Sequence, residues 1–116
     1  MHIDYDQRTF RSVDNSPGGD VDARTFFKYR QKGNVVWATY EGPAIAFGTL
    51  TALVLPEGKL DMRYQHVSTD GHIKTGRYLS TPEILPDGRI RLHERWRWTE
   101  GGEGEGESRI EEDAQA

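Results

Sequence analysis

Hydrophobic and polar residues alternate in the segment 89–98, RIRLHERWRW. Successive side chains of a β-strand point to opposite faces, so a strand here would divide this segment into two sets. One face would carry Ile90, Leu92, Glu94, Trp96 and Trp98. The other would carry Arg89, Arg91, His93, Arg95 and Arg97. The pattern predicts a strand with an apolar inner face that includes one carboxyl group, that of Glu94.

Glycine-centred turns divide the rest of the chain into similar segments. They lie at QKGN (31–34), EGPA (41–44), PEGK (56–59), TDGH (69–72) and PDGR (86–89), and no amphipathic helical period lasts three turns. About eight strands are predicted, at 8–13, 24–31, 34–41, 44–55, 59–67, 72–81, 89–99 and 106–112, with room for a short helical turn within 15–24. This spacing predicts an all-β, antiparallel up-and-down meander that closes into a calycin-like barrel. A sandwich is the alternative.

Two-residue loops at 32–33, 57–58 and 70–71 would assign the side chains of these strands to faces. The predicted inner face holds Phe27, Tyr29, Val36, Ala38, Tyr40, Ile45, Phe47, Leu53, Leu55, Leu60, Met62, Ile73, Leu79, Ile90, Leu92, Trp96 and Trp98. The same face takes in four polar residues, Tyr64, His66, Arg77 and Glu94. A β-bulge at any turn would shift the register by one residue.

The polar residues on this apolar face are the candidate site. An isolated buried charge costs several kcal/mol, so each charged group needs a partner, water or a ligand. One interpretation is an internal hydrogen-bond and salt-bridge network that fixes the register. The other is a solvated cavity that binds a small anionic or amphipathic molecule. Its ligand-binding residues would be Tyr64, His66, Arg77, Glu94, Trp96 and Trp98.

The 116-residue length and the charge distribution indicate one domain with an acidic end. The net charge is −4, but residues 100–116 hold seven acids and one base, which leaves 14 bases and 12 acids in residues 1–99. We therefore expect a barrel body over 1–100 and an acidic Gly/Glu-rich tail over 101–116, which could add a closing strand at 106–112. Cysteine is absent, so the fold depends on neither disulfides nor Cys-ligated metal.

Sequence motifs favour binding over catalysis. The chain shows no nucleophile motif, no Gly-rich phosphate loop and no paired-carboxylate spacing, and its four histidines form no HxH or HxxxH pair. No cofactor, metal site or catalytic residue is therefore predicted. An enzyme using the same cavity is the first alternative, and a structural or dimerisation module with a self-filled core is the second.

The predicted outer face has a basic and an apolar part. The arginines at 89–97 form a basic stripe, for which little aromatic interleaving and the nearby acids favour a solvated strand face over nucleic acid. Phe26, Val35, Trp37, Leu50, Ala52 and Val54 form an apolar set. This set predicts a homodimer through Phe26, Trp37, Leu50 and Val54, or a covering N-terminal segment, unless the strand 44–55 is buried on both sides of a sandwich. No apolar run follows Met1 or approaches about 20 residues, so no membrane association and a cytoplasmic location are expected.

Two long stretches carry a resemblance to a known family. They are VVWATYEGPAIAFGTLTALV and LDMRYQHVSTDGHIKTGRYLSTPEILPDGRIRLHERWRWTEGG, within which LDMRYQHV and STPEILPDGRIRLHE are the specific runs. Over nearly its whole length the chain resembles a family of small, uncharacterised single-domain bacterial proteins that often carry the label N-acetylglutamate synthase. The fold of that family resembles the calycins, lipocalin-like barrels that commonly bind small apolar or amphipathic ligands. The labelled activity uses a Gly-rich strand-to-helix turn to hold acetyl-CoA, and no Q/R-x-x-G-x-G/A motif occurs here. The resemblance therefore supports the fold more than the function.

Overall fold

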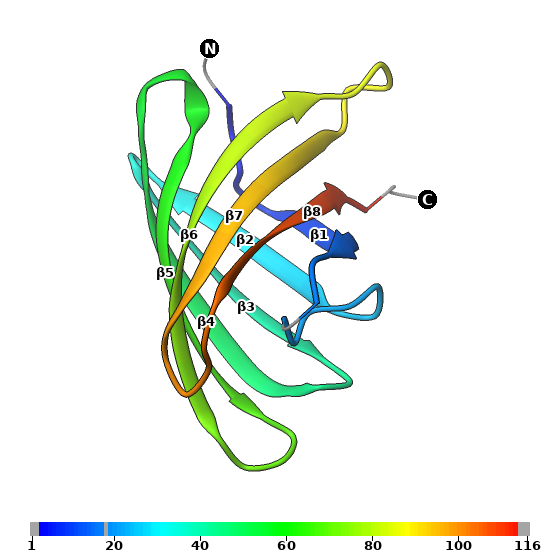
Figure 1. The fold of residues 1–116 in the computed structure, drawn as a ribbon. Coiled ribbons are helices and arrows are strands. Elements are labelled where there is room, and N and C mark those ends of the chain that lie inside the picture. Colours follow the sequence, from blue (N-terminus) through cyan, green and yellow to red (C-terminus); the bar gives the residue numbers. More distant parts are fainter. Residues whose placement is uncertain (1–2, 18, 114–116) are drawn as a thin grey trace.

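Eight antiparallel strands form a closed barrel in the order of the sequence (Figure 1). The structure is a computed structural model that describes residues 3–17 and 19–113. The strands are β1 (Arg8–Asn15), β2 (Phe26–Lys32), β3 (Val35–Gly42), β4 (Ile45–Val54), β5 (Leu60–Ser68), β6 (Ile73–Ile84), β7 (Ile90–Glu100) and β8 (Glu105–Glu112), with a 3-10 turn, η1 (Pro56–Gly58), between β4 and β5. This confirms the predicted up-and-down barrel. The acidic segment contributes the closing strand, because β8 pairs with both β7 and β1.

The alternation predicted for residues 90–98 is confirmed. Ile90, Leu92, Glu94, Trp96 and Trp98 of β7 are all buried. They join an interior contributed by all eight strands and by Ile3, Tyr5 and Val21 from the connecting segments. The neighbouring Arg95 and Arg97 are exposed.

Ile45 of β4 is buried as predicted, but the faces predicted for the rest of β4 and for β6 are wrong. On these two strands Leu50, Ala52, Tyr78 and Ser80 are buried. Five residues predicted inside, Phe47, Leu53, Ile73, Arg77 and Leu79, are exposed. Leu55 lies outside the strands, beside η1.

The reversed face of β4 removes three residues from the predicted outer apolar set. Phe26, Val35 and Trp37 are exposed as predicted, whereas Leu50 and Ala52 are buried in the barrel and Val54 packs against its core. The predicted homodimer stays a prediction, and Leu50 and Val54 cannot be part of its surface.

The lengths of the turns on either side of β5 explain the reversed faces of β4 and β6, and the turn before β7 has the same length. The backbone N–H of Leu55 donates to the Lys59 carbonyl (2.7 Å), and the same bond joins Ser68 to His72 (2.8 Å) and Leu85 to Arg89 (2.8 Å). Each bond closes a three-residue loop whose last residue is a glycine with φ of 78°, 88° or 89°. A three-residue loop with glycine in the left-handed region shifts the pairing by one residue relative to a two-residue loop. A one-residue shift moves every side chain of the next strand to the opposite face.

Glycines lie opposite several large aromatic side chains inside the barrel. The register pairs Tyr40 with Gly48 and Trp96 with Gly106. A Cβ atom at either glycine would overlap the opposing ring. The bare backbone therefore allows these rings to lie against the barrel wall.

Among the described residues, no helix is long or apolar enough to cross a membrane.

Candidate functional site in the barrel lumen

The carboxyl group of Glu94 lies in the lumen between two serines. The register places Ser80 of β6 and Ser108 of β8 directly opposite Glu94, one on each side. The Ser80 hydroxyl donates to Glu94 Oε2 at 2.7 Å, and Ser108 also hydrogen-bonds the carboxyl group. Burial raises the pKa of Glu94 to about 7, although both serine hydrogen bonds act in the opposite direction. Near neutral pH this group therefore exists in both its protonated and ionised forms.

Two tyrosine hydroxyls lie close enough to Glu94 to sense its charge. Tyr29 is 1% exposed and Tyr78 is 8% exposed. Burial, and then the negative charge of Glu94, raises the pKa of both phenols well above the ordinary value. Both therefore remain protonated at neutral pH and can act as hydrogen-bond donors. The buried Tyr29 hydroxyl has no hydrogen-bond partner within the described part of the chain.

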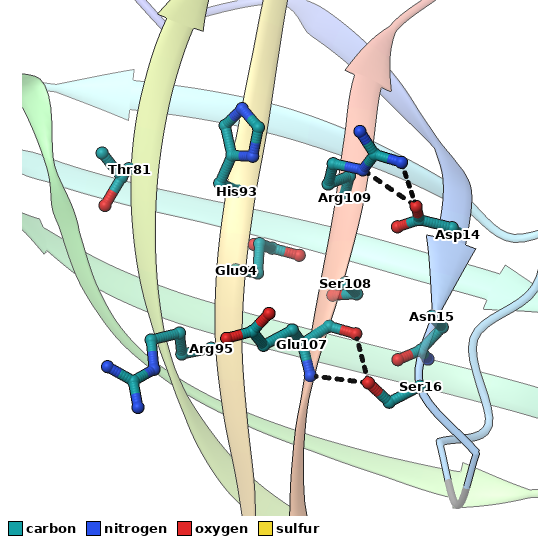
Figure 2. Close-up of a pocket in the computed structure, with 10 residues that line it drawn as sticks. All are labelled: Asp14, Asn15, Ser16, Thr81, His93, Glu94, Arg95, Glu107, Ser108 and Arg109. Carbon is teal, nitrogen blue, oxygen red and sulfur yellow. Dashed lines mark hydrogen bonds and ion pairs between the residues drawn. The ribbon is translucent and has the colours of Figure 1, made fainter.

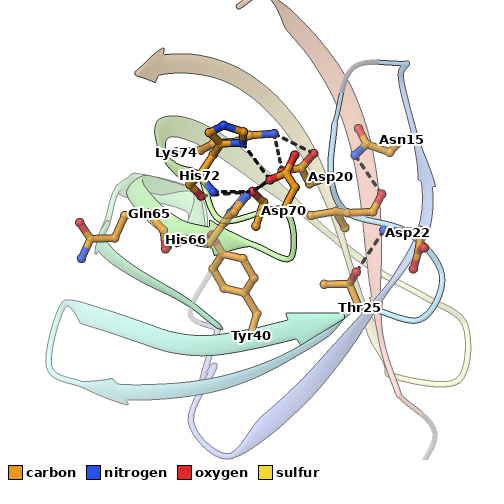
Figure 3. Close-up of polar contacts among 12 residues, drawn as sticks. Asn15, Asp20, Asp22, Thr25, Tyr40, Gln65, His66, Asp70, His72 and Lys74 are labelled. Atoms are coloured by element: carbon orange, nitrogen blue, oxygen red, sulfur yellow. Dashed lines mark hydrogen bonds and ion pairs between the residues drawn. The ribbon is translucent and has the colours of Figure 1, made fainter. Parts of the chain in front are cut away.

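A second polar cluster lies at the end of the lumen where the β1–β2 connection crosses the barrel (Figure 3). His66 Nδ1 lies 2.9 Å from the Tyr40 hydroxyl, and His66 Nε2 lies 3.0 Å from Asp20 Oδ2. Lys74 Nζ donates to both Asp20 oxygens, at 2.9 and 3.2 Å. Asp20 thus joins the β1–β2 connection to β5 and β6.

The partners of His66 determine its tautomer. Burial lowers the pKa of His66, against the opposing effect of Asp20, so the imidazole is neutral at pH 7. An ionised carboxylate can only accept a hydrogen bond, so the proton of the neutral ring lies on Nε2. Nδ1 then accepts a hydrogen bond from the Tyr40 hydroxyl, and the oxygen of that hydroxyl can still accept a hydrogen bond from another group.

Asn15 makes a further link between the β1–β2 connection and the lumen. Its Oδ1 accepts a hydrogen bond from the indole N–H of Trp96 at 2.7 Å. Its Nδ2 donates to the Val21 carbonyl at 3.2 Å. Because an indole N–H only donates and a carbonyl only accepts, this amide orientation is the one that satisfies both partners.

Aromatic rings form the wall between the two polar clusters. The ring centroids of Tyr64 and Tyr78 lie 4.4 Å apart, and those of Tyr64 and Trp98 lie 5.7 Å apart. Trp98 also lies 5.6 Å from His66 and 6.0 Å from Trp96, both edge-on. Lys74 Nζ lies 5.3 Å from the centroid of the Trp98 ring, a cation–π geometry.

The structure brings together most of the predicted site residues. Tyr64, His66, Glu94, Trp96 and Trp98 are all buried in the lumen. The inward placement of Arg77 is wrong, because the three-residue turn between β5 and β6 puts its side chain on the outer face.

Sequence reasoning missed several polar residues of the lumen. Ser80 and Ser108 could be identified as partners of Glu94 only if the pairing registers of β7 with β6 and with β8 were known. Asp20 lies in a connection without any periodic pattern. The β7 alternation alone could identify Glu94, but not its partners.

An outer groove over β6, β7, β8 and the end of β1 is a separate feature (Figure 2). Its lining residues are Asp14, Asn15, Ser16, Thr81, His93, Glu94, Arg95, Glu107, Ser108 and Arg109. Arg109 is ion-paired with Asp14, and Ser16 hydrogen-bonds the Glu107 backbone. Glu94 and Ser108 also line this groove, but both residues are buried. Across residues 3–17 and 19–113, no group of three or more His, Asp and Glu side chains is arranged to hold a metal ion.

Comparison with known proteins gives one match. No curated protein and no solved structure matches the chain. The comparisons do not bear on the label N-acetylglutamate synthase. A family model described as Avidin-like protein matches residues 3–113, which is nearly the whole chain and all eight strands. The chain therefore belongs to the Avidin-like family of calycin-type β-barrels, a family that binds small ligands.

Proposed function

We propose that this protein binds a small amphipathic molecule in the barrel lumen. The polar head of the ligand contacts Glu94 and the Tyr29 hydroxyl, and its apolar body lies against Tyr64, Trp96 and Trp98. Membership of a family of ligand-binding barrels supports this function. The fit of the lumen to such a ligand rests on the following three observations.

The unpartnered hydroxyl of Tyr29 carries the proposal. A buried donor without an acceptor costs about 1–3 kcal/mol, and few such groups occur in folded proteins. Tyr29 is 1% exposed, its hydroxyl has no partner in the described part of the chain, and after burial the charge of Glu94 is the next cause that raises its pKa. A ligand oxygen or nitrogen that accepts this hydrogen bond would remove the cost.

The charges of the lumen favour a ligand with an uncharged head. Arg77, which the sequence suggested as an anion partner, lies outside the barrel. Lys74 is already paired with Asp20 at 2.9 Å, and the ionised form of Glu94 would repel an anion. Because the Tyr29 hydroxyl can donate and Glu94 can accept, an amide-like or urea-like head suits the site.

The aromatic wall suits the apolar body of such a ligand. Tyr64, Tyr78, Trp96 and Trp98 pack against one another on adjacent strands. Ligand pockets of this kind combine apolar and aromatic walls with few polar groups.

Tryptophan fluorescence can test this function with biotin as the first compound. Trp37 is exposed, whereas Trp96 and Trp98 are buried, so in a Trp37→Phe variant the emission reports on the lumen alone. We expect biotin, or an uncharged amphipathic dye such as N-phenyl-1-naphthylamine, to change this emission saturably. Native mass spectrometry of the protein purified from its host would detect a molecule already bound. No saturable change with either compound and no co-purifying molecule would contradict the proposal.

Two buried tyrosines provide a matched pair of variants. Tyr29→Phe removes the hydroxyl without a partner, so we expect unchanged or higher thermal stability and about tenfold weaker binding. The Tyr5 hydroxyl already donates to the Gly58 carbonyl at 2.6 Å. Tyr5→Phe should therefore lower stability by about 1 kcal/mol and leave binding unchanged. Equal effects of the two variants on binding would exclude a role for Tyr29 in ligand recognition.

A further inference from the structure

Four exposed apolar side chains lie together on the outside of the barrel. They are Val35 and Trp37 of β3, Leu53 of β4 and Leu79 of β6, which are 37%, 41%, 50% and 41% exposed. Val35 lies directly opposite Leu53, and Asp61 of β5 lies between Leu53 and Leu79. Water therefore faces an apolar strip that Asp61 interrupts between Leu53 and Leu79.

Basic residues lie directly beside this strip. The strand registers pair Val35 with Lys32, Trp37 with Arg30, and Leu79 with Arg95. We call these seven residues, together with Arg63, Arg77 and Arg97, the mixed face. All of the basic residues of the mixed face are exposed.

Three arginines of the mixed face form a continuous row. Arg77 of β6 lies directly opposite Arg63 on one side and Arg97 on the other. Like charges directly opposite each other in a sheet destabilise it. Asp61 neutralises Arg63 at 2.7 Å, but within the described residues neither Arg77 nor Arg97 makes an ion pair. Glu105 of β8 lies directly opposite Arg97, so Arg77 is the member of the row with no acid directly opposite it and would gain from an external anion.

Arg91 of β7, Arg109 of β8 and Arg89, which directly precedes β7, differ in this respect. Arg91 is paired with Glu111 at 2.9 Å, Arg89 with Asp87 at 2.6 Å, and Arg109 with Asp14. Of the basic residues for which the described part of the chain shows no ion pair, Arg30, Lys32, Arg77, Arg95 and Arg97 lie on the mixed face, and Arg11, Lys28 and Lys59 lie elsewhere. The mixed face is thus basic, although the chain as a whole carries a net charge of −4.

We propose that the mixed face docks the protein onto the surface of an anionic lipid bilayer. Arginine and lysine side chains reach lipid phosphates while their stems lie along apolar surface. Tryptophan and leucine side chains bury themselves at the boundary between headgroups and acyl chains. The combination of both kinds of residue favours a bilayer over a nucleic acid, which would leave Val35, Leu53 and Leu79 in water.

The three tryptophans make this docking directly measurable. Trp37 belongs to the mixed face, whereas Trp96 and Trp98 are buried in the barrel. Vesicles of phosphatidylcholine mixed with phosphatidylglycerol should sediment the full chain and shift its emission to shorter wavelength. The Trp37→Phe variant should lack the emission shift. Vesicles of phosphatidylcholine alone should bind at least tenfold more weakly, since each Lys or Arg near an anionic surface contributes roughly 1 kcal/mol, or about fivefold.

Double variants separate the contribution of the basic residues to vesicle binding from that of the apolar residues. Arg77→Gln with Arg95→Gln should weaken vesicle binding about tenfold or more, whereas Arg89→Gln with Arg91→Gln, which removes paired arginines, should not. Leu53→Ser with Leu79→Ser should also weaken binding about tenfold. The control is Phe47→Ser with Ile73→Ser, which changes a patch that is even more exposed but lies on another row.

Each remaining outcome decides against the proposal. No sedimentation with anionic vesicles would overturn it, as would equal losses in the test and control variants. Binding to single-stranded DNA as tight as to the vesicles would show that the mixed face recognises any polyanion. A monomer–dimer shift in sedimentation velocity caused by the mixed-face variants, without any change in vesicle binding, would assign the face to a second copy of the chain.

Discussion

At the scale of single residues, Glu94 is the group whose environment departs most from that of an exposed side chain. It lies in the lumen between Ser80 and Ser108, with the Tyr29 and Tyr78 hydroxyls near enough to sense its charge. The two serine hydroxyls stabilise the ionised form only in part, because burial still raises the pKa of Glu94 to about 7. The folded barrel therefore favours the protonated carboxyl group, and its stability must depend on pH.

The pH dependence has a definite sign. Between its ordinary pKa of 4.5 and its folded pKa of about 7, Glu94 holds a proton in the folded chain that the unfolded chain has released. The free energy of unfolding therefore falls as pH rises through this range, by about 3 kcal/mol at most. His66 acts in the opposite sense, since its lowered pKa removes stability as pH falls below 6.5.

A Glu94→Gln variant isolates the contribution of this residue. Relative to the natural chain, we expect the variant to gain up to about 3 kcal/mol of unfolding free energy between about pH 5 and pH 8, as measured by urea denaturation at each pH. Arg91→Gln, on the outer side of the same strand, should keep the pH dependence of the natural chain. Parallel pH curves for the natural chain and Glu94→Gln would show that Glu94 is not desolvated.

At the scale of strands, the sequence predicts the alternation of side chains within one strand. It does not predict which set of side chains on the neighbouring strand points into the barrel. The inward set of β7 follows from its sequence alone, because Ile90, Leu92 and Trp96 fix the parity for Glu94. The assignment of β6 depends on the turn before it, where one additional residue moved Arg77 outside and Tyr78 inside. Both faces of β4 and β6 carry apolar residues, so the hydrophobic pattern of these strands could not show that the wrong face had been assigned to the interior.

The pairing of Tyr40 with Gly48 makes a strand-level prediction. A Cβ atom at Gly48 would overlap only the side chain of Tyr40 among its nearest neighbours. We expect Gly48→Ala to cost about 1–3 kcal/mol of unfolding free energy in the natural chain. In a Tyr40→Ala background the same substitution should cost close to nothing, which a double-mutant cycle by chemical denaturation would measure. Additive effects would mean that the ring does not lie over Gly48.

At the scale of the whole molecule, β8 turns an open meander into a barrel. Its outward residues connect it to β1 through the Arg109–Asp14 ion pair, and Arg8 is paired with Glu112 at 2.8 Å. Its inward residues, Ser108 and Ile110, reach Glu94 and the core. The acidic, glycine-rich composition of this region resembles that of a mobile tail, yet the unpaired edges of β1 and β7 can be satisfied only by this strand.

Closure by β8 predicts the behaviour of a shortened chain. A chain ending at Gly104 would expose two unpaired strand edges, which promote aggregation, and would leave Glu94 without Ser108. We expect it to lose the near-ultraviolet circular dichroism of the buried tryptophans and to aggregate. A chain ending at Asp113, which retains all of β8, should unfold cooperatively like the full chain. If the chain ending at Gly104 stayed monomeric and unfolded cooperatively, the closing pairs between β8 and β1 would not be required for the fold. The core would then be held by the strands from β1 to β7 alone.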